Sequence, residues 1–199
     1  MVNSLVYVAS TGGYYSTEPQ VSNDYLGKKV AVYVANNFVY LPSKELIEKE
    51  IGSYINDDLR ACIATLDLSG VDEINVNDIN TKATLSKDRA VAKSYVDIEL
   101  VKEETSFKLS NLDSIEKTEL LSLYNLAVDL ATQQKQESGG LCISCFADLE
   151  EKTNINILIY DFAPEQNILL YTLQSKTLGA NPDLIFQFFA ERVTYETYS

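Results

Sequence analysis

Four short stretches of the chain recur in the same order in its second half. Residues 47–49 match 115–117, 62–63 match 142–143, 67–68 match 148–149, and 74–76 match 155–157. The offsets are 68, 80, 81 and 81 residues, so two insertions account for all the changes in spacing. Such a repeat predicts a chain built from two related supersecondary units. Chance is the alternative, because Ile, Leu, Asp, Asn and Lys are common in this sequence.

Each copy of the repeat contains a hairpin followed by a helix. Apolar runs on both sides of Asn36 and Asn37 predict a hairpin over residues 29–41, since paired asparagines tolerate the positive φ of a tight turn. A second hairpin is expected at about residues 91–109. Ser43 is a suitable N-cap for a helix that ends near residues 57–58. Asp113, with Glu116 completing a capping box, predicts a second helix that ends at the glycines of residues 138–140.

The remaining elements follow from short apolar runs and turn residues. Strands are expected at residues 5–8, 62–68, 141–149, 154–162 and 167–174. Asn181 followed by Pro182 predicts the start of a last helix. The expected fold class is α+β, with mostly antiparallel sheets from two hairpin–helix–hairpin units and a C-terminal helix.

The expected domain organisation separates an N-terminal segment from a larger body. Residues 1–28 form a strand and a tyrosine-bearing arm, and residues 29–199 form an α+β body. The body divides into related halves, 29–80 and 90–162, followed by a strand and a helix within 167–193.

The charge and composition exclude several classes of function. The chain of 199 residues has a net charge of −13 and contains no histidine. Proteins that hold nucleic acid or anionic lipid need a cationic surface, so we expect neither kind of direct contact. Without histidine, Ser-His and Cys-His catalysis and histidine-bound metals are excluded.

The N-terminus and the apolar runs predict where the protein acts. The first basic residue is Lys28, and no apolar run approaches 18 residues, so we expect neither a secretory signal nor a membrane span. Three cysteines do not form a disulfide framework. The predicted location is the cytoplasm, or a particle such as a virion that is assembled inside a cell.

Cysteines and carboxylates are the remaining candidates for chemistry. Cys142 and Cys145 form a C-x-x-C motif, but in an expected strand they point to opposite faces, and Cys62 alone cannot complete a zinc site. Asp97 and Glu99 share one face of an expected strand and resemble part of a Mg²⁺ site. The solvated face of an amphipathic strand has the same pattern. We therefore predict no catalytic residues, no cofactor and no metal.

Tyrosines in the expected arm and tail are the candidate partner interface. The chain has 13 tyrosines, and the five proposed for the interface are Tyr14, Tyr15, Tyr25, Tyr195 and Tyr198. Tyrosine is enriched at protein–protein contacts. If the arm is such an interface, replacing Tyr14 and Tyr15 with alanine weakens assembly and leaves the melting temperature of the monomer nearly unchanged. The alternative is that these rings pack on their own core.

Three hypotheses for the function follow. The first is a non-catalytic protein–protein assembly subunit, an oligomer or part of a larger complex, for which a structural component of a virion or phage particle is one example. The second is an acidic partner-binding protein, either a chaperone-like module or an inhibitor that mimics nucleic acid. The third is a carboxylate-metal enzyme that uses Asp97 and Glu99.

Overall fold

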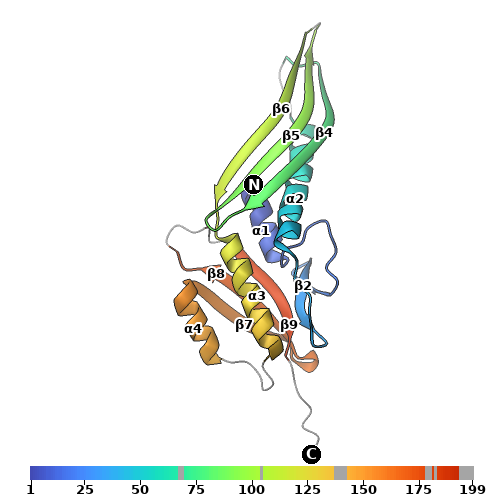
Figure 1. The fold of residues 1–199 in the computed structure, drawn as a ribbon. Helices are drawn as coiled ribbons and strands as arrows, with labels where there is room; N and C mark the ends of the chain where they lie inside the picture. The colour runs from blue at the N-terminus through green and yellow to red at the C-terminus, as the bar shows by residue number, and fades with distance from the viewer. Residues whose placement is uncertain (67–69, 104, 137–142, 178–180, 182, 193–199) are drawn as a thin grey trace, which may run out of the picture.

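The computed structural model describes residues 1–66, 70–103, 105–136, 143–177, 181 and 183–192. Within these ranges the chain has an α+β fold with four α-helices and two sheets, one mixed and six-stranded, the other antiparallel and three-stranded (Figure 1). No helix in the described ranges is both long and apolar enough to cross a membrane.

The mixed sheet is the centre of the body. Its strands lie in the order β1-β2-β9-β8-β7, and the short β3 pairs with the end of β2, at Val34 and Ala35. β2 and β9 run parallel, and the other neighbours are antiparallel. The bounds are β1 Ser22–Tyr25, β2 Lys28–Ala35, β3 Phe38–Val39, β7 Ile155–Ala163, β8 Ile168–Ser175 and β9 Ile185–Glu191.

Helices cover one face of the mixed sheet and enclose the main core. These are α1 Val2–Ser10, α3 Leu120–Gln136 and α4 Ile143–Thr153 (Figure 1). Aromatic rings from three neighbouring strands stack beneath them: the Phe188 ring lies 4.7 Å from that of Tyr33 and 4.8 Å from that of Tyr171, centroid to centroid. The Tyr171 hydroxyl donates to Gln134 of α3 at 3.0 Å. Helices and sheet are therefore joined by apolar packing with satisfied polar groups.

The three-stranded sheet projects from the body along the long helix α2 Lys44–Ala64 (Figure 1). Its strands are β4 Glu73–Leu85, β5 Arg89–Lys102 and β6 Thr105–Lys117, in the order β4-β5-β6. α2 packs on β4, and Gly52 permits the close approach, since a Cβ there would lie 2.5 Å from the Thr81 carbonyl oxygen. Further along, Leu59 and Ile63 of α2 contact a small buried cluster of Ile79, Val96 and Ile98.

Several predicted elements are confirmed. Asn36 and Asn37 have φ angles of 49° and 63° in the turn between β2 and β3. The Ser43 hydroxyl accepts a hydrogen bond from the Leu46 N–H at 3.1 Å and caps α2. β7 and β8 match the strands expected at 154–162 and 167–174, and the second hairpin exists as β5 and β6.

Both ends of the chain differ from the prediction. Residues 5–8 lie in helix α1 and not in a strand, because Leu5, Val8 and Ala9 form a helical stripe buried in the core. The predicted C-terminal helix is wrong, since the last described element is strand β9. The Asn181 side chain accepts from the Asp183 N–H at 2.9 Å, which makes a turn before the strand.

The predicted boundaries of the inner helices are also wrong. α2 continues to Ala64, so Cys62 lies in a helix, because Leu59 and Ile63 extend its apolar stripe over the small cluster. Asp113 belongs to β6 and caps nothing. The helix begins at Leu120, whose N–H donates to the Thr118 hydroxyl at 3.2 Å.

The strand predicted at 141–149 is helix α4 from residue 143 on. Phe146 and Leu149 of this helix pack against the main core. Cys142, and with it the geometry of the C-x-x-C motif, lies outside the described residues, as do the glycines at 138–140.

The internal repeat does not correspond to a repeated structure at its first match. Residues 47–49 lie in helix α2, whereas residues 115–117 lie in strand β6. Residues 74–76 and 155–157 are both in strands, but in different sheets. The division into halves at 29–80 and 90–162 therefore gains no support from these matches.

Candidate interaction surface

Exposed apolar side chains concentrate on two edge strands. In the described part of the chain, 13 large apolar side chains are exposed, and seven of them lie on β6 or β7. They are Phe107, Leu109, Leu112 and Ile115 on β6, and Leu158, Tyr160 and Phe162 on β7. Scattered exposed apolar residues are ordinary, but a concentration on a sheet edge marks a binding surface.

β6 is the outer strand of the projecting sheet. Among the described residues it pairs with β5 alone, so its other edge presents unpaired backbone N–H and C=O groups. Every residue from Thr105 to Ile115 is exposed. The exposed fractions reach 65% for Phe107 and 67% for Ile115. β6 therefore offers both backbone hydrogen bonds and apolar area.

The register with β5 sets the neighbours of these side chains. Leu109 and Phe107 lie opposite Ile98 and Leu100, which belong to or contact the small buried cluster. Leu112 lies opposite Ser94, whose hydroxyl is buried against Thr81 at 2.7 Å. The apolar side chains of β6 thus border the buried part of the sheet without being covered themselves.

The other edge of the same sheet is built differently. β4 is as long as β6, yet its exposed positions carry one large apolar side chain, Val76, among polar and charged ones. α2 also packs along β4. A covering helix is one protection of a sheet edge, and β6 lacks it over its described residues; its exposed positions mix four large apolar side chains with polar and charged ones.

Most of the net negative charge of the chain lies outside the projecting sheet. Residues 73–117 carry seven Lys or Arg and nine Asp or Glu, a net charge of −2, so −11 of the total −13 lies elsewhere. β6 itself contains Lys108, Lys117, Asp113 and Glu116 and is neutral. The sheet can therefore approach another protein without the repulsion that the body would impose.

β7 is one of the two edge strands of the mixed sheet. Leu158, Tyr160 and Phe162 alternate along it with Ile157 and Ile159, which face the helices. The Phe162 ring also contacts Phe189, with centroids 4.7 Å apart. This strip is shorter than that of β6 and partly covered.

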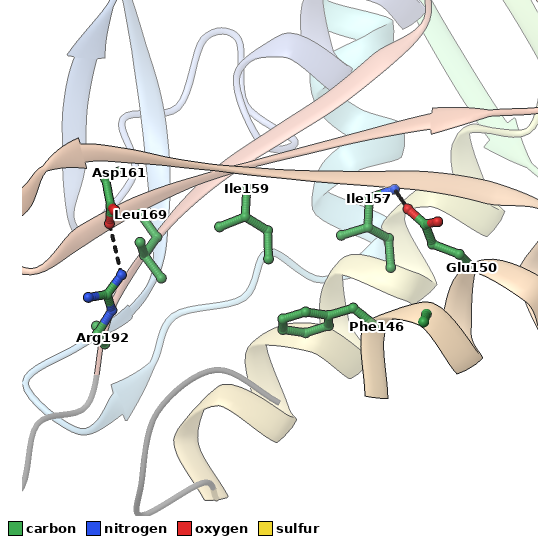
Figure 2. A pocket seen from close by; sticks show the side chains of 8 residues that line it. Phe146, Glu150, Ile157, Ile159, Asp161, Leu169 and Arg192 are labelled. Carbon is green, nitrogen blue, oxygen red and sulfur yellow. Dashed lines mark hydrogen bonds and ion pairs between the residues drawn. The ribbon is translucent and has the colours of Figure 1, made fainter. Parts of the chain in front are cut away.

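A pocket of about 430 Å³ lies between α4 and β7 (Figure 2). Its middle is apolar, with Phe146, Ile159 and neighbouring side chains. At one end a Glu150 carboxylate oxygen accepts from the Ile157 N–H at 2.5 Å. At the other end Arg192 forms an ion pair with Asp161 at 2.8 Å. Because both charged ends are paired within the chain, the pocket offers mainly apolar contact.

The predicted arm packs on its own chain. The Tyr15 ring contacts the rings of Tyr7 and Tyr54, with centroids 5.5 and 4.9 Å apart, and its hydroxyl donates to Asp57 at 2.8 Å. Burial, followed by this hydrogen bond, raises the pKa of Tyr15 to about 12. Tyr14 is partly buried against the main core. These contacts agree with the alternative in which the tyrosine rings of the arm pack on their own core.

The other proposed interface tyrosines are spread across the molecule. Tyr25 lies in β1, where its ring contacts Phe162 and Phe189. Tyr195 and Tyr198 lie outside the described residues. The structure therefore does not bring the five tyrosines together as one surface, and their role in binding stays a prediction.

Glu50 fixes the start of the arm. Its carboxylate is fully buried and accepts from the backbone N–H groups of Tyr15 at 2.7 Å, Thr17 at 3.0 Å, and Ser16. Burial alone raises the pKa of Glu50, but the hydrogen bonds from Thr17, Tyr15 and Ser16 outweigh it, so the pKa lies below its ordinary value. Glu50 thus has a structural role that its sequence pattern did not indicate.

The candidate carboxylates lie on β5, away from any pocket described above. Asp97 accepts a hydrogen bond from the Asn77 side chain at 3.3 Å, and Glu99 lies opposite Asn75 of β4. In the ranges that the structure describes, no group of three or more His, Cys, Asp or Glu side chains could hold a metal ion.

The sequence does not indicate β6 as a surface, because the spacing of Asp113 and Glu116 in its second half is that of a helix start. The available signal was the alternation of Phe107 and Leu109 with polar residues, which is typical of a strand.

Comparison of the chain with protein-family models, with curated proteins and with solved structures gives no match.

Proposed function

We propose that the protein is a non-catalytic assembly subunit that binds other protein chains through the free edge of β6. The observation that carries this proposal is a 13-residue edge strand with four exposed large apolar side chains and no covering element among the described residues. Addition of a strand to such an edge supplies backbone hydrogen bonds, and the side chains supply apolar burial.

The energetics favour this surface over the tyrosine arm. Burying a large apolar side chain stabilises a complex by about 1.5–3 kcal/mol, so Phe107 and Ile115 alone return several kcal/mol. Because β6 is already held in an extended form by its pairing with β5, little chain entropy is lost on binding. A strand fixed before binding is therefore an efficient docking element.

Light scattering on the purified full chain over a wide range of concentrations tests this proposal. We expect a mass greater than that of one chain at the higher concentrations. Replacing Phe107 and Ile115 with serine should return the chain to a monomer while its circular dichroism spectrum is kept. A chain that is monomeric at every concentration, or an oligomer unaffected by both substitutions, would contradict the role of β6.

A further inference from the structure

We infer that residues 15–17 form a preformed binding site for a small carboxylate, and that the chain fills this site with its own Glu50. When the Glu50 carboxylate is removed, the site binds a free carboxylate such as acetate in its place. The inference concerns the arm and α2, and it does not depend on the free edge of β6.

Three successive backbone N–H groups are the main donors of this site. Those of Tyr15, Ser16 and Thr17 all donate to one carboxylate oxygen of Glu50, Oε2. The Ser16 hydroxyl donates to the same oxygen at 3.2 Å, and the Thr17 hydroxyl donates to Oε1 at 2.5 Å. Successive N–H groups that converge on one point form a nest, a concave arrangement that binds anions. The main chain therefore supplies most of the recognition of the carboxylate.

The site stabilises negative charge through these dipoles. No ion pair in the described ranges includes Glu50, although its side chain is fully buried. A buried carboxylate persists only where hydrogen bonds replace its hydration. Burial raises the pKa of Glu50, but the hydrogen bonds from residues 15–17 outweigh burial and hold the pKa below its ordinary value. The donors thus favour an ionised carboxylate over a neutral acid.

Contacts that do not involve Glu50 hold the loop in shape. The chain turns before the nest at Gly12 and Gly13, whose φ angles of 72° and 93° favour glycine. The Gly13 N–H donates to the Val8 carbonyl oxygen at 2.8 Å. The Gly12 carbonyl oxygen accepts from the buried Tyr33 hydroxyl at 3.1 Å. Because these contacts remain when the Glu50 side chain is shortened, the donors stay arranged for another acceptor.

The loop is also open to anions from the solvent. Ser16 and Thr17 are exposed, although the carboxylate that they hold is buried. A pocket of about 290 Å³ borders the loop, and Glu18, Lys28 and Lys29 are the charged residues that line it. Glu18 forms an ion pair with Lys29, so Lys28 leaves this pocket with a net positive charge. A local positive charge attracts anions even though the chain as a whole is acidic.

Acetate is the probe that fits the site in Glu50→Ala. The substitution removes the Cγ methylene group and the carboxylate, which together have the size and charge of an acetate ion. With a dissociation constant of about 0.1 M, about 0.5 M sodium acetate raises the folding equilibrium constant about fivefold over equal sodium chloride. The corresponding rise in melting temperature is about 2–4 °C for a chain of this length, measured by circular dichroism at neutral pH. The wild type, whose site is filled, defines the effect of acetate on a protein that does not bind it.

Two variants of the same helix are the controls. In the described ranges the Glu48 carboxylate accepts from a single backbone N–H, that of Leu85 at 2.7 Å, and it pairs with Lys44. Glu48→Ala therefore removes a carboxylate without leaving a nest, and acetate should raise its melting temperature no more than that of the wild type. Glu50→Gln keeps a side-chain oxygen in the nest, so it should gain no more than the wild type either.

A gain in Glu50→Ala that exceeds the gains of the wild type and of both controls supports the inference. Equal gains in all four proteins would overturn it, because acetate would then act on the chain without filling the nest. If Glu50→Ala does not fold in chloride, its circular dichroism spectrum in acetate becomes the measurement. Recovery of the wild-type spectrum supports the site, and a chain that stays unfolded in acetate overturns it.

Discussion

Replacing Glu50 with alanine should destabilise the protein strongly. The Glu50 carboxylate is held by hydrogen bonds from the arm and not by a positively charged side chain of the arm. The side chain is fully buried and accepts from three consecutive backbone N–H groups, those of Tyr15, Ser16 and Thr17. Glu50→Ala removes the acceptor and leaves these donors without a partner.

The magnitude follows from the number of donors. An unpaired buried donor costs about 1–3 kcal/mol, and water repairs part of the loss because Ser16 and Thr17 lie at an exposed part of the chain. We expect Glu50→Ala to lower the free energy of unfolding by about 3–5 kcal/mol. For a chain of this length that corresponds to a fall in melting temperature of about 10 °C. Glu50→Gln keeps one acceptor oxygen and should lose less, about 1–2 kcal/mol.

The effect should depend on pH. Because the pKa of folded Glu50 lies below its unfolded value, the ionised carboxylate stabilises the fold above the unfolded pKa. That contribution is lost as the pH falls through the folded pKa. The difference in stability between the wild type and Glu50→Gln should therefore be full at neutral pH and shrink below about pH 5.

Urea unfolding followed by far-UV circular dichroism measures these differences. Asp58→Ala, which removes an exposed carboxylate from the same helix, is the control and should change the stability by less than about 0.5 kcal/mol. A loss below about 1 kcal/mol for Glu50→Ala, or a difference between Glu50→Gln and wild type that does not change with pH, would refute the reasoning.

Three further substitutions test the packing. Gly52→Ala should destabilise the protein by about 1–3 kcal/mol in urea unfolding, because the added Cβ meets the Thr81 carbonyl oxygen, and this outweighs the higher helix propensity of alanine. A stabilised variant would contradict the close approach of α2 to β4. Tyr14→Ala combined with Tyr15→Ala should lower the free energy of unfolding by about 2–4 kcal/mol, and the melting temperature with it, because both rings pack within the chain. An unchanged melting temperature would instead favour an interface role for the two tyrosines. Asn37→Ala should lower the stability measured by thermal melting by about 1 kcal/mol, because alanine tolerates a φ of 63° poorly. An unchanged stability would show that the turn adopts another conformation in the variant.

Local signals in the sequence predicted the elements whose chemistry is short-range. The Asn36-Asn37 turn and the Ser43 cap depend on residues a few positions apart, and both exist in the structure. The α+β class follows from the same signals. Tertiary packing decided the rest: residues 5–8 contain β-branched side chains, yet their helical stripe is buried against the core.

The candidate surface was harder to predict than the fold class. Asp113 and Glu116 have the spacing of a capping box, but β5 pairs with this segment along its whole length, and the long-range ladder prevails over the local cap. Loop tyrosines are interface residues in many proteins, but here Tyr15 has partners in α1 and α2. Which strand stays at an edge is set by topology, and no short motif encodes it.

Hydrogen–deuterium exchange at low and high protein concentration tests the central claim most directly. If chains assemble through the free edge of β6, exchange of the backbone amides within residues 106–116 should slow as the concentration rises, because the outer N–H groups gain partners. Amides of β4 at the opposite edge should exchange at the same rate throughout. Exchange in β6 that stays equally fast while the mass of the particle doubles would contradict the account.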